Sequence, residues 1–170
     1  MTAQADVQRT SSKDPRLGAW RSFLTAHARL TRLLDEELRA EHGLSLAEYD
    51  ALLQLAEAPD RRMRMNRLAE QVILSRSGVT RLIDRLVANG LVERSACLAD
   101  ARGAEAVLTD AGLQRLRTAA RTHLRGISAY FVEPLARDDL ATIERSLGLI
   151  AHVCTGGGAS GPDAEVRRDA

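Results

Sequence analysis

The segment from Met65 to Thr109 constrains the fold of this chain more than any other stretch. It contains two helical patterns separated by a turn, followed by two short segments with the composition of half-buried strands. Asn66 is the expected N-cap of the first helix, and Ser75 is that of the second. The second helix is expected to end at Asn89-Gly90 and to bury apolar residues three and four apart. These residues are Val79, Leu82, Ile83 and Leu86. The pattern predicts a helix-turn-helix.

The outer face of the second helix is polar and basic, as a DNA-recognition helix requires. It carries Arg76, Ser77, Thr80, Arg81 and Arg85. Residues 91–94 and 104–108 then fit two short strands with one apolar face. That face is expected to contain Leu91, Ala104, Ala106 and Leu108. A two-stranded ribbon beside a recognition helix is a wing, so the segment predicts a winged helix-turn-helix in a mainly α fold.

These residues resemble the MarR family of bacterial winged-helix regulators. The resemblance is carried by LA-x3-IL-S-x-S-G-V-T-R-L-I-D-R-L-x3-G-L-V-E-R and by the later runs D-A-R-G and V-L-T-D-A-G. It extends from about Trp20 to Val153. One departure is Ala101, where the family often has a second arginine before Arg102. The resemblance implies a two-fold dimer whose two recognition helices meet one face of DNA.

The apolar patterns and the resemblance together predict the domain organisation. The ranges are 1–15 for a disordered tail, 16–154 for a single MarR-type domain and 155–170 for a flexible tail. Within the domain, 45–108 is the winged helix-turn-helix, and 16–42 and 109–154 are the dimerisation helices. Ser45 and Glu48 are expected to form a capping box, and Thr109 and Asp138 to cap the two helices after the wing. The first of these two helices is expected to carry Leu116 and Leu124 on an apolar stripe. These terminal helices carry more apolar surface than a small core can cover, so we expect a homodimer. The alternative is a monomer whose last helix folds back on its first.

The distribution of charge favours nucleic acid as the partner. Residues 61–102 contain nine arginines and four acidic residues, a net charge of +5, whereas the whole chain carries +1 and the remainder therefore −4. A basic segment on an otherwise acidic chain is typical of a nucleic-acid footprint, although a solvated charged surface is the alternative. The chain has no apolar run long enough for a membrane span and no secretory signal at its start. With only two cysteines, we expect a cytoplasmic protein.

The recognition helix is expected to divide its contacts between bases and backbone. We expect Arg76, Ser77 and Thr80 to approach bases, and Arg81 and Arg85 to lie nearer the phosphates. The N-cap Ser75 would place helix-end amides beside a phosphate. Gly78 would allow close approach of the backbone to DNA, or is a tolerated small residue.

The wing is expected to add contacts of its own. The resemblance implies that Arg102 enters the minor groove, where the negative potential is concentrated. Arg94 is a further candidate for DNA contact. Asp100 is expected to hold the wing by pairing with an arginine, of which Arg94 is one option, more than to touch an anion itself.

The sequence predicts no enzyme, no metal site and no cofactor. The four histidines, His27, His42, His123 and His152, have no metal-ligand spacing, and there is no Gly-rich phosphate loop or nucleophile elbow. His27 and His123 lie on or beside apolar stripes, either as core histidines or as the lining of a pocket. The resemblance implies a pocket for small aromatic or phenolic acids. Its first candidates are Trp20, His27 and Tyr49.

Three functions are therefore considered. The first is a dimeric repressor that a small ligand releases from a pseudo-palindromic operator in double-stranded DNA. The second is a redox regulator of the same fold that uses Cys97, because nearby Arg94 would lower the pKa of its thiol. Cys154 is expected to be a core residue of the last helix, which leaves Cys97 without a resolving partner close in sequence. The third is a winged-helix module that binds protein.

Overall fold

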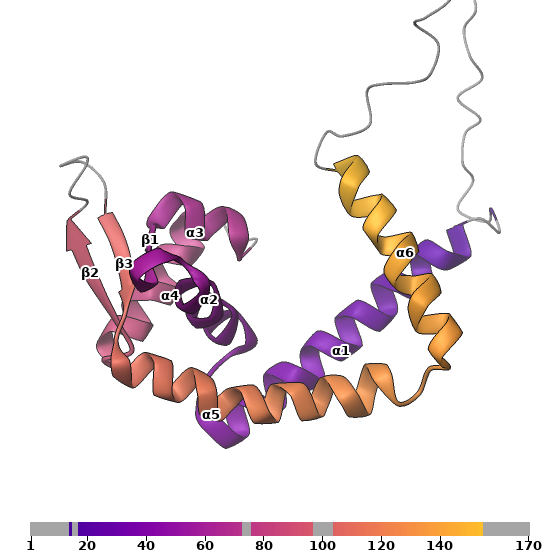
Figure 1. The fold of residues 1–170 in the computed structure, drawn as a ribbon, viewed down its shortest axis with the longest axis horizontal. Helices are drawn as coiled ribbons and strands as arrows, with labels where there is room; N and C mark the ends of the chain where they lie inside the picture. Colours follow the sequence, from indigo (N-terminus) through magenta and orange to yellow (C-terminus); the bar gives the residue numbers. More distant parts are fainter. Residues whose placement is uncertain (1–13, 15–16, 73–75, 97–103, 155–170) are drawn as a thin grey trace, which may run out of the picture. The chain divides into compact units, whose positions relative to one another are not determined.

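The computed structural model describes residues 14, 17–72, 76–96 and 104–154, which form parts of two compact units, Met1–Ile127 and Ser128–Ala170. The first unit contains α1 (Gly18–His42), α2 (Leu46–Glu57), η2 (Pro59–Arg61), β1 (Arg62–Arg64), α3 (Met65–Gln71), α4 (Arg76–Ala88), β2 (Val92–Ala96), β3 (Ala104–Leu108) and α5 (Asp110–Ile127). The second contains η3 (Ser128–Val132) and α6 (Arg137–Cys154). The fold is mainly α, with a winged helix-turn-helix, as predicted (Figure 1).

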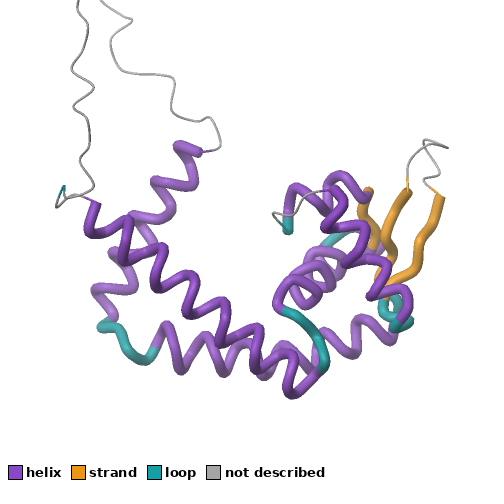
Figure 2. The backbone as a smooth tube through the Cα atoms, turned by 180° about the vertical axis from the view of Figure 1, so that it is seen from behind, coloured by secondary structure: helices purple, strands orange, loops and turns teal. Residues whose placement is uncertain are grey.

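The first unit has one apolar core beneath the helix-turn-helix. Helices α2, α3 and α4 pack against one another, and β1, β2 and β3 lie beside them on one side of the unit (Figure 2). Helix α5 packs against α1 and α2. The largest side chains that are fully buried include Leu38, Leu44, Leu52, Leu55, Leu68, Leu82, Ile83 and Leu86. This core supports α4 from behind.

The turn between α1 and α2 follows from local sequence. Gly43 ends α1 with a φ of 65°, a left-handed conformation that glycine adopts without a steric penalty. Ser45 and Glu48 then form the predicted capping box at the start of α2. The Ser45 N–H donates to Glu48 Oε2 at 2.9 Å, and the Glu48 N–H donates to Ser45 Oγ at 3.2 Å.

The sheet has three antiparallel strands in the order β1-β3-β2, one more than the sequence predicted. Strand β1 was missed because it has only three residues, and only Met63 among them is buried. The register places Met63 opposite Ala106 and Val92 opposite Leu108. Ala104 was expected on the apolar face but is exposed, so the buried part of the wing is confined to its base.

Of the other predicted N-caps within the described residues, Asn66 and Asp138 are wrong and Thr109 is right. Helix α3 starts at Met65, and Asn66 lies inside it, where its Oδ1 accepts the N–H of Arg67 at 2.9 Å. Asp138 likewise lies within the first turn of α6 instead of capping it. Thr109 does cap α5, since its Oγ1 accepts the N–H of Gly112 at 2.9 Å.

Helix α5 buries small and polar residues where longer apolar ones were expected. Leu124 was placed on its apolar stripe but is 62% exposed in the single chain. The buried face includes the expected Leu116, together with Gly112, Ala119 and Thr122. Thr122 is 3% exposed, and its hydroxyl donates to Glu41 Oε2 at 2.7 Å. Short side chains on this face let α5 lie close to its neighbours.

Apolar side chains remain exposed on α1 and, separately, on α6. Trp20, Phe23 and Leu24 are exposed on α1. On α6 the exposed set is Leu147, Leu149, Ile150 and Val153. Cys154 is also exposed, so its predicted place in a core is wrong for the single chain, in which α6 buries no residue. None of the described helices is both long enough and apolar enough to cross a membrane.

Candidate functional site

Helix α4 presents a polar face on the side opposite the core. Ser77, Thr80, Arg81 and Arg85 are exposed and Gly78 is half-buried, whereas the four predicted inward residues are all buried. Arg81 donates from Nε to the Ser77 carbonyl at 3.3 Å, one helical turn earlier. Arg76 is the first residue of α4, and Ser75 lies outside the described residues.

Arg85 has an ion-pair partner inside its own unit. Its Nε donates to Glu48 Oε1 at 2.7 Å, and Glu48 is only 7% exposed. Burial by itself raises the pKa of the Glu48 carboxyl, but hydrogen bonds from the Ser45 N–H and the Arg85 guanidinium outweigh it, so this pKa lies below its usual value. The Arg85 side chain still remains 57% exposed. The arrangement joins the outer face of α4 to the start of α2.

Arg94 joins the wing to the recognition helix. Its Nη2 lies 2.7 Å from Asp84 Oδ1 and donates to the Thr80 carbonyl at 3.5 Å. Both of these partners belong to α4, whereas the sequence suggested Asp100 as a partner. Asp100 and Arg102 lie outside the described residues, so their roles stay predictions.

The basic segment is less uniformly positive than its sequence suggests. Besides Arg85 and Arg94, Arg61 lies 2.9 Å from Asp110, and Arg62 lies 3.9 Å from Glu105. Within the described parts of the chain, Arg64, Arg67 and Arg81 have no carboxylate partner within ion-pair distance. The available positive charge is therefore concentrated on the outer faces of α3 and α4 and the end of β1.

A cavity of about 770 Å³ lies between α1, α2 and α5. His27, Tyr49 and His123 all line it, and the ring centroids of Tyr49 and His123 are 4.5 Å apart. Trp20 does not line it: this residue is 55% exposed, and its ring packs 6.0 Å from that of Phe23 on α1. The structure thus brings two of the three predicted pocket residues together and adds His123.

The cavity wall contains two titratable groups, His123 and Asp50, whose pKa values are shifted by burial. Burial lowers the pKa of His123 and raises the pKa of Asp50. In both residues burial therefore favours the neutral form more than water would. His123 Nδ1 is buried and has no hydrogen-bond partner. Neutral imidazole and an aromatic ring on one wall suit a flat ligand that carries a hydroxyl group.

Sequence reasoning missed the partners Glu48 and Asp84. Glu48 was visible only as part of a capping box, and it lies 37 residues from Arg85. His123 was noted on its stripe, but nothing in the sequence paired it with Tyr49. Among the described residues, no cluster of three or more His, Cys, Asp or Glu side chains could hold a metal ion.

Both the sequence and the fold of this chain are similar to those of known proteins. Residues 42–103 match a family model described as the MarR family. The structure of AbsC, a MarR family transcriptional regulator from Streptomyces coelicolor, is 35% identical, and the match covers 84% of this chain and 96% of AbsC with a TM-score of 0.76. The chain belongs to the MarR family.

Two further MarR-family structures contain DNA. Sco3205 from Streptomyces coelicolor, in complex with DNA, is 29% identical over 92% of this chain and 94% of its own, with a TM-score of 0.76. A mutant MarR from E. coli, complexed with operator DNA, is 25% identical over 80% of this chain and 94% of its own, with a TM-score of 0.69. A comparison with curated proteins gave no match. This MarR-family protein is a transcriptional regulator, like its relatives, and not an enzyme.

Proposed function

We propose that this MarR-family regulator is a dimeric repressor that leaves a pseudo-palindromic operator when a small aromatic or phenolic acid binds. The observation that carries the proposal is the contact between the cavity-lining helix α2 and the recognition helix α4. The cavity is lined by Tyr49 on α2, and Glu48, the preceding residue, holds Arg85 on α4. A ligand that shifts α2 would therefore shift the recognition face.

The exposed face of α4 supports the assignment of DNA contacts. Ser77, Thr80 and Arg81 share this face, where an arginine can pair with guanine or phosphate. Arg85 would use the part of its guanidinium that Glu48 leaves open. The contacts proposed for Ser75, Arg76, Gly78, Arg94, Asp100 and Arg102 rest on sequence position and resemblance.

Exposed apolar residues support a second copy of the chain as a partner. Trp20, Phe23 and Leu24 form an apolar face on α1, and α6 carries another set around Ile150. Monomeric proteins rarely expose contiguous apolar surface of this kind. Residues 16–42 and 109–154 would then form the dimer, with 45–108 as its DNA-binding part.

Operator binding is tested with the DNA upstream of the protein's own gene. Footprinting should reveal two related half-sites with centres about one helical turn, or ~10 base pairs, apart. Affinity should fall steeply as salt rises, because bound phosphates release counterions. A footprint with a single unsymmetrical half-site would contradict binding of a dimer to a palindrome. Operator affinity that does not change with salt concentration would contradict the proposed phosphate contacts.

Ligand release is tested with salicylate, a phenolic carboxylate. Salicylate should raise the melting temperature of the free protein and weaken operator binding ten- to a hundredfold, which requires a coupling of about 1.4–2.7 kcal/mol. His123→Ala should reduce both effects, because its ring lines the cavity. The matched control is His152→Ala on α6, which is exposed and should retain both. Binding of salicylate without any change in operator affinity would refute release by this ligand.

A further inference from the structure

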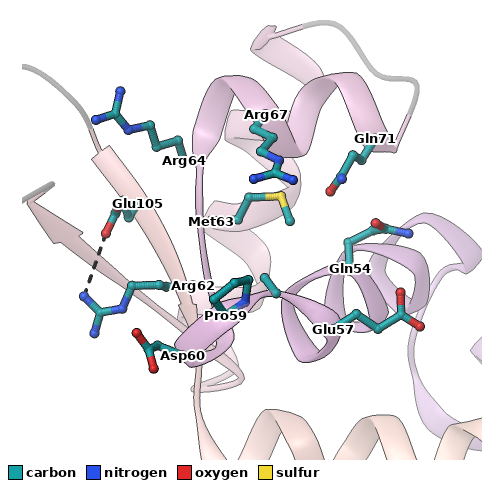
Figure 3. Close-up of a pocket in the computed structure, with 11 residues that line it drawn as sticks. Gln54, Glu57, Pro59, Asp60, Arg62, Met63, Arg64, Arg67, Gln71 and Glu105 are labelled. Atoms are coloured by element: carbon teal, nitrogen blue, oxygen red, sulfur yellow. Dashed lines mark ion pairs between the residues drawn. The ribbon is translucent and has the colours of Figure 1, made fainter.

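A second cavity, of about 550 Å³, lies where α2, η2, β1 and α3 meet (Figure 3). Arg62 and Arg64 reach it from β1, Arg67 from α3, and Gln54 and Glu57 from α2. It shares no lining residue with the cavity around His123. The proposed DNA contacts and the proposed effector site leave all of these residues without a role.

The cavity is lined by charged groups of both signs that lack close partners. Arg62 Nε is buried without a hydrogen-bond partner, and its Nη1 is 3.9 Å from Glu105, a long ion pair. Arg67, like Arg64, has no carboxylate within ion-pair distance among the described residues, and Glu57 on α2 has no such cation. A buried donor without an acceptor is unfavourable, so Arg62 is incompletely satisfied at this edge of the cavity.

A strained turn forms one edge of the cavity. Asp60 and Arg61 both have left-handed backbones, with φ angles of 52° and 55°, which non-glycine residues rarely adopt. The ion pair between Arg61 and Asp110 holds this turn at the start of α5. Strain of this kind concentrates at ligand sites, where the surrounding structure maintains it. The turn leads directly into Arg62.

We propose that this cavity binds a free α-amino acid. A ligand carboxylate would pair with the guanidinium group of Arg67, which lies beside Met63, and the ligand ammonium would pair with Glu57 near the negative end of α2 (Figure 3). The buried Met63 and the neighbouring Pro59 supply an apolar wall for the ligand side chain (Figure 3).

The balance of charge distinguishes this ligand from a simple anion. Three arginines line the cavity, but so do the carboxylates of Glu57, Asp60 and Glu105. An anion alone, including a DNA phosphate, would leave these carboxylates uncompensated and repelled. A zwitterion satisfies both sets. The ligand would contact both α2 and α3. It would therefore influence the position of the helix-turn-helix independently of any ligand in the cavity around His123.

The test uses the full-length protein without DNA, so its outcome is independent of operator binding and of release by aromatic acids. The twenty standard α-amino acids are tested singly by thermal shift and by calorimetry. At least one should bind, and both its N-acetyl derivative and its carboxamide should bind at least tenfold more weakly, because each lacks one charge. No binding by any amino acid, or equal binding of acetate or inorganic phosphate, would overturn the proposal.

Two charge-removing variants locate the site. Arg67→Gln and Glu57→Gln should each weaken binding of the best amino acid at least tenfold, and both side chains are exposed enough for the fold to tolerate the change. Arg117→Gln and Glu144→Gln, at exposed positions outside the cavity, serve as matched controls and should bind normally. Unchanged affinity in both cavity variants would overturn the assignment to this site.

Discussion

Arg85 on the recognition helix donates from Nε to Oε1 of Glu48, 2.7 Å away at the start of α2. The same carboxylate accepts the N–H of Ser45 through Oε2, so its position is fixed from two sides. The orientation of α4 is thereby linked to a helix that also lines the aromatic cavity through Leu46, Ala47 and Tyr49. The proposed DNA contact of Arg85 and the stability of the fold would consequently both depend on this one guanidinium group.

Arg81 and Arg85 should behave differently when each is replaced by alanine. Arg81→Ala, which removes a proposed phosphate contact, should weaken binding to all sequences alike and make the salt slope shallower by about one unit. Arg85→Ala should also lower the free energy of unfolding by ~1–3 kcal/mol, because it leaves the buried Glu48 without its cation. Operator titrations at several salt concentrations and urea unfolding measure the two effects. Equal loss of stability in both variants would contradict the role given to Glu48.

A third alanine variant should distinguish contacts to DNA bases from contacts to the phosphate backbone. Arg76→Ala should relax base preference at one position in each half-site, at a cost of about 1–3 kcal/mol for the preferred base. Competition between operators with single substitutions measures this preference, with Arg81→Ala as the control that weakens all of them equally. If the two variants discriminate between operators in the same way, Arg76 does not read a base.

The contribution of Glu48 to stability should depend on pH. Its folded-state pKa lies below the ordinary value of 4.5, so the ionised carboxylate stabilises the fold above that pH, and this stabilisation is lost as pH falls through the folded-state pKa. Glu48→Gln should therefore be less stable than the wild type near pH 7, and the difference should shrink below pH 4.5. Urea unfolding of both proteins across this range measures it. If the difference in stability between the two proteins grew as the pH fell, the pKa of Glu48 would be raised by folding and not lowered, which would contradict this prediction.

Gly112 should not tolerate a side chain. A Cβ at this position would lie 2.1 Å from the Leu91 carbonyl oxygen and 2.7 Å from Leu108 Cδ1, and the backbone cannot move away cheaply. Gly112→Ala should therefore destabilise the protein by ~1–3 kcal/mol or more. Gly148→Ala on α6, where the new Cβ meets nothing within 4 Å, should be neutral or stabilising by up to about 1 kcal/mol. Thermal unfolding compares the two, and similar melting temperatures would contradict the close approach of α5 to Leu91.

Cys97 distinguishes a ligand-controlled regulator from a redox-controlled one. If this residue only belongs to the wing, Cys97→Ser should leave operator binding and release by salicylate nearly unchanged. Peroxide should then affect the wild type and the variant alike. Release of the wild type by peroxide, with the serine variant still bound, would make the thiol-based function the better account. Because Cys154 is exposed, Cys154→Ser is the necessary control.

The sequence by itself determined the features that act over a few residues. The capping box of Ser45 and Glu48, the left-handed Gly43 and Gly90, and the cap at Thr109 were all predictable, because each satisfies backbone groups within one helical turn. The inward face of α4 was predictable too, since a helix repeats its buried side every three or four residues. Together with the motif, these local rules were enough for a winged helix-turn-helix.

Only the tertiary structure decided which distant groups became partners. Periodicity states that a side chain faces inward or outward, but it does not say which charge or ring will face it. Arg85 therefore forms an ion pair with Glu48, and Arg94 forms one with Asp84 instead of the suggested Asp100. The ring of Tyr49 likewise lies against that of His123. The three-residue strand β1 formed because β3 was available beside it, since its own sequence is too short to favour a strand. Such pairings depend on how the chain folds back on itself, and that is a property of packing across the whole unit.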